Sequence, residues 1–492
     1  MNGEAAAVDT GKPRPSATGA LIGLSLSMFM ASLDTSIANS GLPTLARAFG
    51  ATFQQVQWIV LAYLLAVTSL IVSVGRLGDM IGRGRLLLGG IALFTVSSLA
   101  CGAASTLWIL VAARAAQGLG AAVMMALSIA FVSETVPREK IGVSMGLLGT
   151  MSAIGTALGP SLGGLLTSAI EWRAIFLVNV PVGIVALALL RRYLPGGSAA
   201  SAVAGRLDLA GTGLLAATLS AYAVAMTAGR GTFGPLNLAL LGLALCGAIL
   251  FVLIESKVED PILELSIFRD LVHSGSLVMS LLVSTVIMST LVVGPFYLAG
   301  ALHLDAARVG LLLSVGPSVV VLAGVPAGKL ADRYGAMRLV PFGLVAMETG
   351  CMLLSILPSR LGVVGYVGPI VILTAGYAVF QTANTTVVMS GAAPEKRGVL
   401  SGTLSLSRNL GLVTGASVMG AVFAFASGSS DMELARTEAV ASGMRSTFAV
   451  GAALIGVALL VSWASRKACQ RTSILRDARC APIGEQAEPI PG

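Results

Sequence analysis

Long stretches of this chain contain few or no charged side chains, and each is long enough to cross a lipid bilayer. Only 11% of the residues are Asp, Glu, Lys or Arg, whereas about 25% is usual in soluble domains. Because lipid offers no partners to backbone polar groups, an open-ended span must be a helix of about 20 apolar residues. The sequence therefore predicts an all-α integral membrane protein with 14 transmembrane helices. The predicted spans are 18–40, 56–75, 86–106, 107–134, 142–168, 174–194, 208–228, 236–254, 273–299, 307–329, 339–357, 362–389, 399–425 and 446–465.

The distribution of Lys and Arg predicts how these helices are oriented. With the N-terminus inside, 22 of the 31 basic residues fall in cytoplasmic segments and seven on the opposite side. The remaining two, Arg114 and Arg408, lie within spans, and no role for Arg408 follows from the sequence. Both termini are thus expected in the cytoplasm. Topology accounts for the net charge of +8, and nucleic acid is not expected as a partner.

Small residues recur at regular spacing in the predicted fifth helix. They are Gly146, Gly155, Gly159, Pro160, Gly163 and Gly164. In a soluble helix each glycine would cost roughly 1 kcal/mol relative to alanine, but in a bilayer small residues allow helices to pack closely. Gly155, Gly159 and Gly163 form one stripe, and we expect it to pack against the opposite half of the protein and close one side of the pore. A generic packing face is the alternative interpretation.

Two sequence blocks recur along the chain. The glycines at 142, 146, 155, 159 and 164 return 256 residues later, and the block 75–85 returns 253 residues later as 328–338. These offsets predict two six-helix halves plus two inserted helices, related as parallel repeats. The predicted divisions are an N-terminal tail (1–17), a first half (18–194), a linker with the inserted helices (195–254), a second half (255–465) and a C-terminal tail (466–492).

These motifs resemble those of the major facilitator superfamily, over residues 18 to 465. The glycine series is similar to the antiporter motif of its exporters, and residues 33–43 resemble a signature of its fourteen-helix drug:proton antiporters. Residues 110–120 match its fourth-helix signature, and residues 75–85 are similar to its loop between helices 2 and 3, although Met80 replaces the usual arginine. The resemblance implies export. It also implies conformational gating by Gly75, Asp79, Gly82, Arg83, Arg85, Asp332 and Arg333. Positively charged residues around a tight turn are the alternative reading of that loop.

Besides Arg408, three charged residues lie where a bilayer disfavours them, and each of the three suggests a functional site. Asp34 is expected to exchange a proton for a cationic substrate, unless it only caps its helix near Pro43. Arg114 is expected to take part in proton coupling, near Asp34 if the first and fourth helices both line the cavity. A purely structural salt bridge is the alternative. Glu348 is expected to contact a cationic substrate, with a packing role as its alternative.

Two aromatic residues of the second predicted helix complete the expected site. Trp58 and Tyr63 could stack on flat cations, although Trp58 could equally anchor the helix at the membrane surface. His273 and His303 have no nearby ligand residues, so no metal is expected, and no cofactor is implied. The chain contains no phosphate-binding loop, so ATP is not expected to be the direct energy source.

The expected function is proton-driven efflux of lipophilic, cationic drugs or biocides across a bacterial cytoplasmic membrane, by a monomer. One alternative is a dedicated exporter of a single metabolite, such as an antibiotic or a siderophore. A membrane enzyme or sensor is a further alternative, but the sequence shows no catalytic constellation and no appended soluble domain. The glycine motif disfavours an importer.

Overall fold

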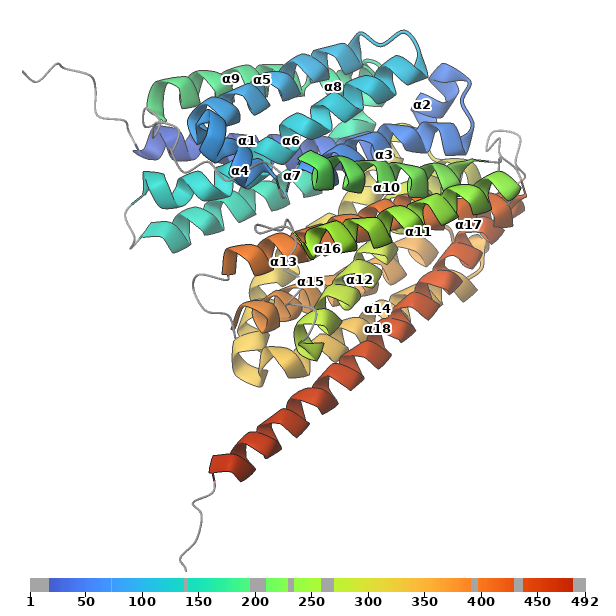
Figure 1. Ribbon diagram of the computed structural model, residues 1–492. Helices are drawn as coiled ribbons and strands as arrows, with labels where there is room; N and C mark the ends of the chain where they lie inside the picture. The colour runs from blue at the N-terminus through green and yellow to red at the C-terminus, as the bar shows by residue number, and fades with distance from the viewer. Residues whose placement is uncertain are drawn as a thin grey trace, which may run out of the picture. The chain divides into compact units, whose positions relative to one another are not determined.

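The protein is described by a computed structural model that covers residues 17–71, 73–136, 140–194, 209–228, 234–257, 270–390, 397–428 and 437–480. All regular structure in these residues is helical (Figure 1). The N-terminal tail up to residue 16, the first part of the linker and the end of the C-terminal tail lie outside the described residues.

Thirteen helices in the described part of the chain are long and apolar enough to cross a membrane. The prediction of an all-helical, multi-pass membrane protein is therefore confirmed. The other predicted span is helix α7 (Ile141–Ala169), which is 29 residues long and uncharged. The count of fourteen spans stays a prediction.

The helices form two compact units. Unit 1 consists of Met1–Ala51, Trp58–Ser220 and Asp305–Ser314, and unit 2 consists of Thr52–Gln57, Ala221–Leu304 and Val315–Gly492. The helices that begin in the first half of the chain are α1 (Ala17–Ser40), α2 (Leu42–Phe49), α3 (Phe53–Leu70), α4 (Val74–Ile81), α5 (Arg83–Gly102), α6 (Leu107–Thr135), α7, α8 (Ala174–Leu177), α9 (Asn179–Tyr193) and α10 (Leu209–Thr227).

The later helices are α11 (Pro235–Glu255), α12 (Leu271–Phe296), η3 (Tyr297–Ala301), α13 (Ala306–Tyr334), α14 (Ala336–Ile356), η4 (Ser359–Leu361), α15 (Gly362–Ser390), α16 (Arg397–Thr414), η6 (Gly415–Met419), α17 (Gly420–Ser427) and α18 (Thr437–Cys480). One predicted span differs from the structure, because residues 56–75 are not one helix. Helix α3 ends at Leu70 and α4 begins at Val74. The intervening residues are β-branched or serine, which favour a helix less than leucine or alanine do.

The two units share one pattern of helix packing. In unit 1, α1 packs against α7 and α9, while α5 packs against α6 and α9. In unit 2, α12 packs against α16 and α18, while α14 packs against α15 and α18. The two turns of the repeated block also share a backbone conformation, since Gly82 has φ +96° and Gly335 has φ +85°. Such positive φ angles favour glycine. The sequence repeat thus corresponds to a structural repeat.

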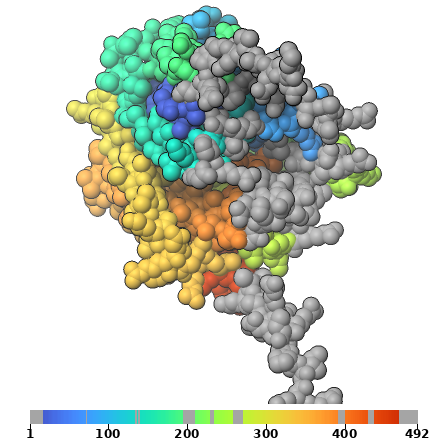
Figure 2. All heavy atoms as spheres, turned by 90° about the vertical axis from the view of Figure 1, so that its left-hand side faces the viewer, coloured from blue at the N-terminus to red at the C-terminus, as the bar shows by residue number. Residues whose placement is uncertain are grey.

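Large apolar side chains cover outward faces of many helices, as expected for contact with lipid. On α13, Leu322 is 76% exposed, and on α14, Phe342 is 70% exposed. Part of the surface of these two helices is the yellow region of Figure 2. In contrast, unit 1 encloses a group of polar and charged side chains, which forms the candidate site.

Candidate functional site

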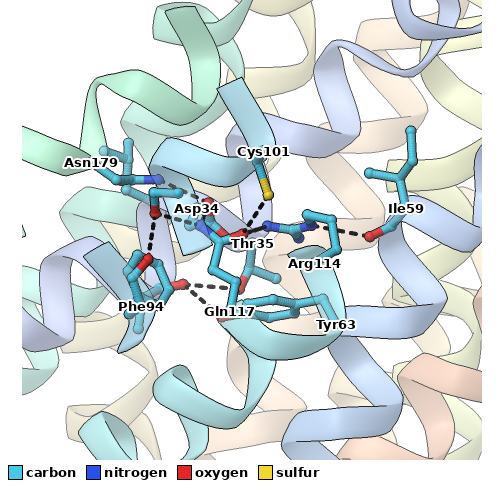
Figure 3. Close-up of polar contacts among 12 residues, drawn as sticks. Asp34, Thr35, Ile59, Tyr63, Phe94, Cys101, Arg114, Gln117 and Asn179 are labelled. Carbon is cyan, nitrogen blue, oxygen red and sulfur yellow. Dashed lines mark hydrogen bonds and ion pairs between the residues drawn. The ribbon is translucent and has the colours of Figure 1, made fainter. Parts of the chain in front are cut away.

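Asp34 lies on α1 and is fully buried, with no exposed surface. Its carboxylate accepts three hydrogen bonds from side chains of α6 and α9 (Figure 3). Arg114 Nη1 lies 2.5 Å from Oδ2, Gln117 Nε2 lies 2.9 Å from Oδ1, and Asn179 Nδ2 lies 2.8 Å from Oδ1. We call Asp34, Arg114, Gln117 and Asn179 the carboxylate cluster. The expected neighbourhood of Asp34 and Arg114 is observed, and both residues belong to unit 1.

Arg114 is 1% exposed, and its guanidinium has partners on all sides. Its Nη1 also donates to Gln117 Oε1 (2.6 Å), and its Nε donates to the carbonyl of Ile59 in α3 (3.0 Å). Its Cζ lies 4.4 Å from the ring centroid of Tyr63 and 5.7 Å from that of Phe176. A buried guanidinium stays protonated and is stable only with such partners. The ionised pair of Asp34 and Arg114 is therefore neutralised and hydrogen-bonded inside the helix bundle.

Gln117 connects Asp34 to α5. Its Nε2 also donates to Ser98 Oγ (2.8 Å), and its Oε1 accepts from Arg114 and, at 3.7 Å, from the Cys101 thiol. Sequence reasoning did not single out Gln117 as a site residue. The same holds for Asn179, which begins α9 and is fully buried. An uncharged amide carries no large cost in a span, so composition alone gives little signal for either residue.

The two aromatic candidates differ in their positions. Tyr63 is 2% exposed and joins the cluster, because its ring lies against Arg114 and its hydroxyl accepts from Thr35 Oγ1 (3.2 Å). The ring is therefore already occupied by a cation of the protein itself. Trp58 is half-buried near the start of α3. Within the described part of the chain, Trp58 makes no hydrogen bond to Asp34.

Glu348 lies in unit 2, whereas the carboxylate cluster lies in unit 1. Its helix, α14, packs against α15 and α18. The side chain is half-buried, and its Oε2 is buried without a hydrogen-bond donor in the described part of the chain. Substrate contact by Glu348 remains a proposal.

The glycine stripe packs against α1, which corrects the expectation that it meets the opposite half of the protein. A Cβ atom at Gly155 would lie 3.0 Å from the Leu33 nitrogen, and one at Gly159 would lie 2.9 Å from the Ile37 nitrogen. Spacing defines the face of a helix but does not identify the helix that this face meets. The stripe thus holds α7 against the helix that carries Asp34.

Gly164, one residue beyond the stripe, meets a different helix. A Cβ atom there would lie 3.0 Å from the Cα of Gly310 in the first turns of α13. Residues 305–314 belong to unit 1 together with α7, although they lie in the second half of the sequence. The Ser314 hydroxyl accepts from the Ser161 nitrogen at 2.8 Å in the same region. Gly146 has no atom within 4 Å of an added Cβ, so packing does not require glycine at that position.

We expect Gly159→Val to lower thermal stability and to abolish transport. The new side chain would collide with the backbone of α1, which cannot rotate away as a side chain can, and such overpacking typically costs about 1–3 kcal/mol. Displacing α1 would also displace Asp34. Gly149→Val is the matched control, because no atom lies within 4 Å of a Cβ at Gly149 on the same helix. Thermal unfolding and ethidium efflux check this, and wild-type behaviour of Gly159→Val would contradict it.

Five of the seven predicted gating residues lie in α4, in α5 or at the glycine turn between these helices. Asp79 and Arg83 form an ion pair at 2.9 Å, with side chains 44% and 42% exposed. In the second copy, Ala336 stands 253 residues after Arg83, so this pair is not repeated. There Arg333 lies over the ring of Tyr334 at 5.4 Å. Gating by Gly75, Gly82, Arg85 and Asp332, together with these residues, remains a proposal.

His273 has a carboxylate partner just outside the membrane-spanning segment. Asp270 Oδ1 accepts from the Val272 nitrogen (2.8 Å) at the start of α12, and Oδ2 lies 2.6 Å from His273 Nδ1. Partial burial raises the pKa of Asp270, but the hydrogen bonds from Val272 and His273 outweigh it, and the pKa is lowered overall. Asp270 therefore acts as a helix cap.

Comparisons with known proteins agree with this architecture. The family model of the Major Facilitator Superfamily matches residues 24–416. The multidrug resistance protein Stp of Mycobacterium tuberculosis is 32% identical over 407 residues, which are 82% of this chain and 75% of Stp. The riboflavin transporter RibZ of Clostridioides difficile is 28% identical over 82% of this chain and 88% of RibZ. The fold is shared by the crystal structure of a bacterial homologue of the human lysosomal transporter Spinster in an inward-facing conformation. The TM-score is 0.66 and the sequence identity 16%, and the match covers 93% of this chain and 98% of that chain.

Proposed function

This chain belongs to the Major Facilitator Superfamily, and we propose that it exports lipophilic, cationic drugs or biocides in exchange for protons across a bacterial cytoplasmic membrane. In this proposal both termini are cytoplasmic and the protein acts as a monomer. Its family makes it a membrane transporter. Proton coupling and the choice of substrate are the parts that we infer.

The observation that carries the proposal is the carboxylate cluster of unit 1. Asp34 is a fully buried carboxylate inside a membrane protein, and such groups commonly mark ion or proton pathways. Proton uptake would make Asp34 neutral and would weaken its attraction to Arg114, which cannot release its own proton. A proton can therefore change the forces between α1 and α6 without any other bound group.

The packing of α1 can transmit this change in the attraction between Asp34 and Arg114 to other helices of unit 1. Helix α1 carries Asp34 on one face and meets the glycines of α7 on another. Because these two helices touch through backbone atoms, a shift of α1 would move α7 with it. This close coupling supports a transport cycle in which the proton state of Asp34 and the arrangement of helices depend on each other.

The relatives support drug export and also favour one alternative. Stp is named a multidrug resistance protein, whereas RibZ is named a riboflavin transporter. The second candidate function is therefore transport of a single metabolite, such as a flavin. In the drug-export proposal, Glu348 and Trp58 remain candidate contacts for a cation, together with Asp34.

A susceptibility panel in a pump-deficient bacterial host tests the two candidates. We expect the wild-type protein to raise resistance to ethidium and to a quaternary ammonium biocide severalfold, and Asp34→Asn to give no protection at equal membrane abundance. Riboflavin content of the same cells is measured in parallel. Unchanged resistance to all cations together with altered riboflavin content would overturn drug export and favour the alternative.

A further inference from the structure

One side-chain amide of the carboxylate cluster, that of Asn179, has a hydrogen-bond partner at only one of its two ends among the described residues. Asn179 is fully buried, and its Nδ2 donates to Asp34 Oδ1 at 2.8 Å. Its Oδ1 is buried as well, and no hydrogen-bond donor reaches it from the residues that the structure describes. A buried acceptor without a donor is unfavourable and calls for an explanation.

The other two donors to Asp34 cannot reverse their roles. Arg114 has only donor groups. Gln117 has partners at both ends of its amide, with Nε2 on Asp34 and Ser98 and Oε1 on Arg114. Turning Gln117 over would place its Nε2 against the guanidinium. Asn179 alone could turn without breaking a second hydrogen bond.

We propose that Asn179 is a positioning residue whose side-chain amide reverses when Asp34 takes up its proton. This inference rests on the proposed function. In the ionised state, Asn179 Nδ2 donates to the carboxylate. When Oδ1 of Asp34 binds a proton from the outer medium, that hydrogen bond is lost, and the new O–H donates to Oδ1 of Asn179. The step adds one proton and no electrons, and release of the proton to the cytoplasm restores the first arrangement.

The two arrangements of the Asn179 amide are expected to have similar free energies. This suits a carboxyl group, Asp34, that must both bind and release a proton. Each leaves one end of the same amide without a partner, so the cost of the unpaired group is similar in both states. The other titratable or charged groups that face Asp34 are Arg114 from α6, Tyr63 from α3 and Cys101 from α5. Asn179, from α9, is the neutral group that can serve either protonation state of Asp34.

Infrared difference spectra between acidic and alkaline pH test this inference on the full-length protein in liposomes. The chain has six asparagines, so labelling them with a ¹³C side-chain carbonyl gives few bands. We expect one labelled carbonyl band to move to lower frequency on acidification, because that oxygen begins to accept a hydrogen bond. The shift is expected to vanish in both Asn179→Leu and Asp34→Asn.

Asn384→Leu is the matched control. Asn384 is also buried, and its Oδ1 has no donor among the residues that the structure describes, but its Nδ2 donates to the Ser276 carbonyl in unit 2 (3.1 Å). Asn384→Leu is expected to show the same shift of the labelled carbonyl band on acidification as the wild-type protein. The inference is overturned if a protonated carboxyl band appears in the acidified wild-type protein while none of the labelled asparagine carbonyl bands shifts, an outcome that does not require any variant to fold.

Ethidium efflux gives a second readout. Asn179→Leu is expected to slow efflux about tenfold, the factor that one hydrogen bond of ordinary strength provides. Asn179→Ser is expected to restore most of the rate, because a hydroxyl can both donate and accept. Equal rates for Asn179→Leu and the wild type would contradict the inference alone, whereas normal coupled efflux by Asp34→Asn would contradict the proposed function.

Discussion

We expect Asp34→Asn to abolish ethidium-driven proton release while the protein still folds and inserts. Asparagine has nearly the same shape and can still accept a hydrogen bond from Arg114, but it binds no proton. Release is measured with a pH-sensitive dye on purified protein in weakly buffered detergent. Asp305→Asn is the control, because Asp305 is an exposed carboxylate that pairs with Arg308 at the start of α13.

Normal proton release by Asp34→Asn would remove Asp34 from the coupling step. Loss of release in the Asp305→Asn control would show that the assay responds to general damage. The prediction therefore requires loss of proton release in Asp34→Asn together with normal proton release in Asp305→Asn.

Arg114→Gln is expected to destabilise the protein by about 3–5 kcal/mol, the usual cost of leaving one member of a buried ion pair without its partner. Gln117 and Asn179 would remain as the neutral donors to Asp34. The double variant Asp34→Asn/Arg114→Gln removes both charges and is expected to recover much of this loss. Thermal unfolding of the purified variants checks the series.

A transport assay separates the effect of these variants on stability from their effect on activity. The double variant is expected to be stable but inactive, because it has neither the proton-binding group nor its counter-ion. If Arg114→Gln alone unfolds at the wild-type temperature, the guanidinium does not neutralise Asp34 in the membrane-embedded protein.

The charged part of the site could be predicted from the sequence, because charge is conspicuous in an apolar span. Asp34 and Arg114 each stood out for that reason. Their amide partners did not, because Gln117 and Asn179 are uncharged and polar residues occur in spans for several reasons. The roles of these amides depend on which atoms face Asp34, and that follows only from the packing of α1, α6 and α9.

The helical fold and its repeat could also be predicted, but helix partners could not. The spacing of Gly155 and Gly159 identifies a small-residue face, and both meet α1. Gly164 lies next in the same motif and meets α13 instead. A linear pattern cannot distinguish these partners, because they are set by how distant helices pack in three dimensions.

The pairing of Asp34 with Arg114 also determines how membrane voltage can act on the protein. With Asp34 ionised, the two charges cancel and the cluster is electrically neutral. With Asp34 protonated, one positive charge remains, because arginine keeps its proton. An electric potential acts on such a charge with about 2.3 kcal/mol per 100 mV across the full membrane. A potential that is negative inside therefore drives the proton-loaded cluster toward the cytoplasm and exerts no net force on the unloaded one.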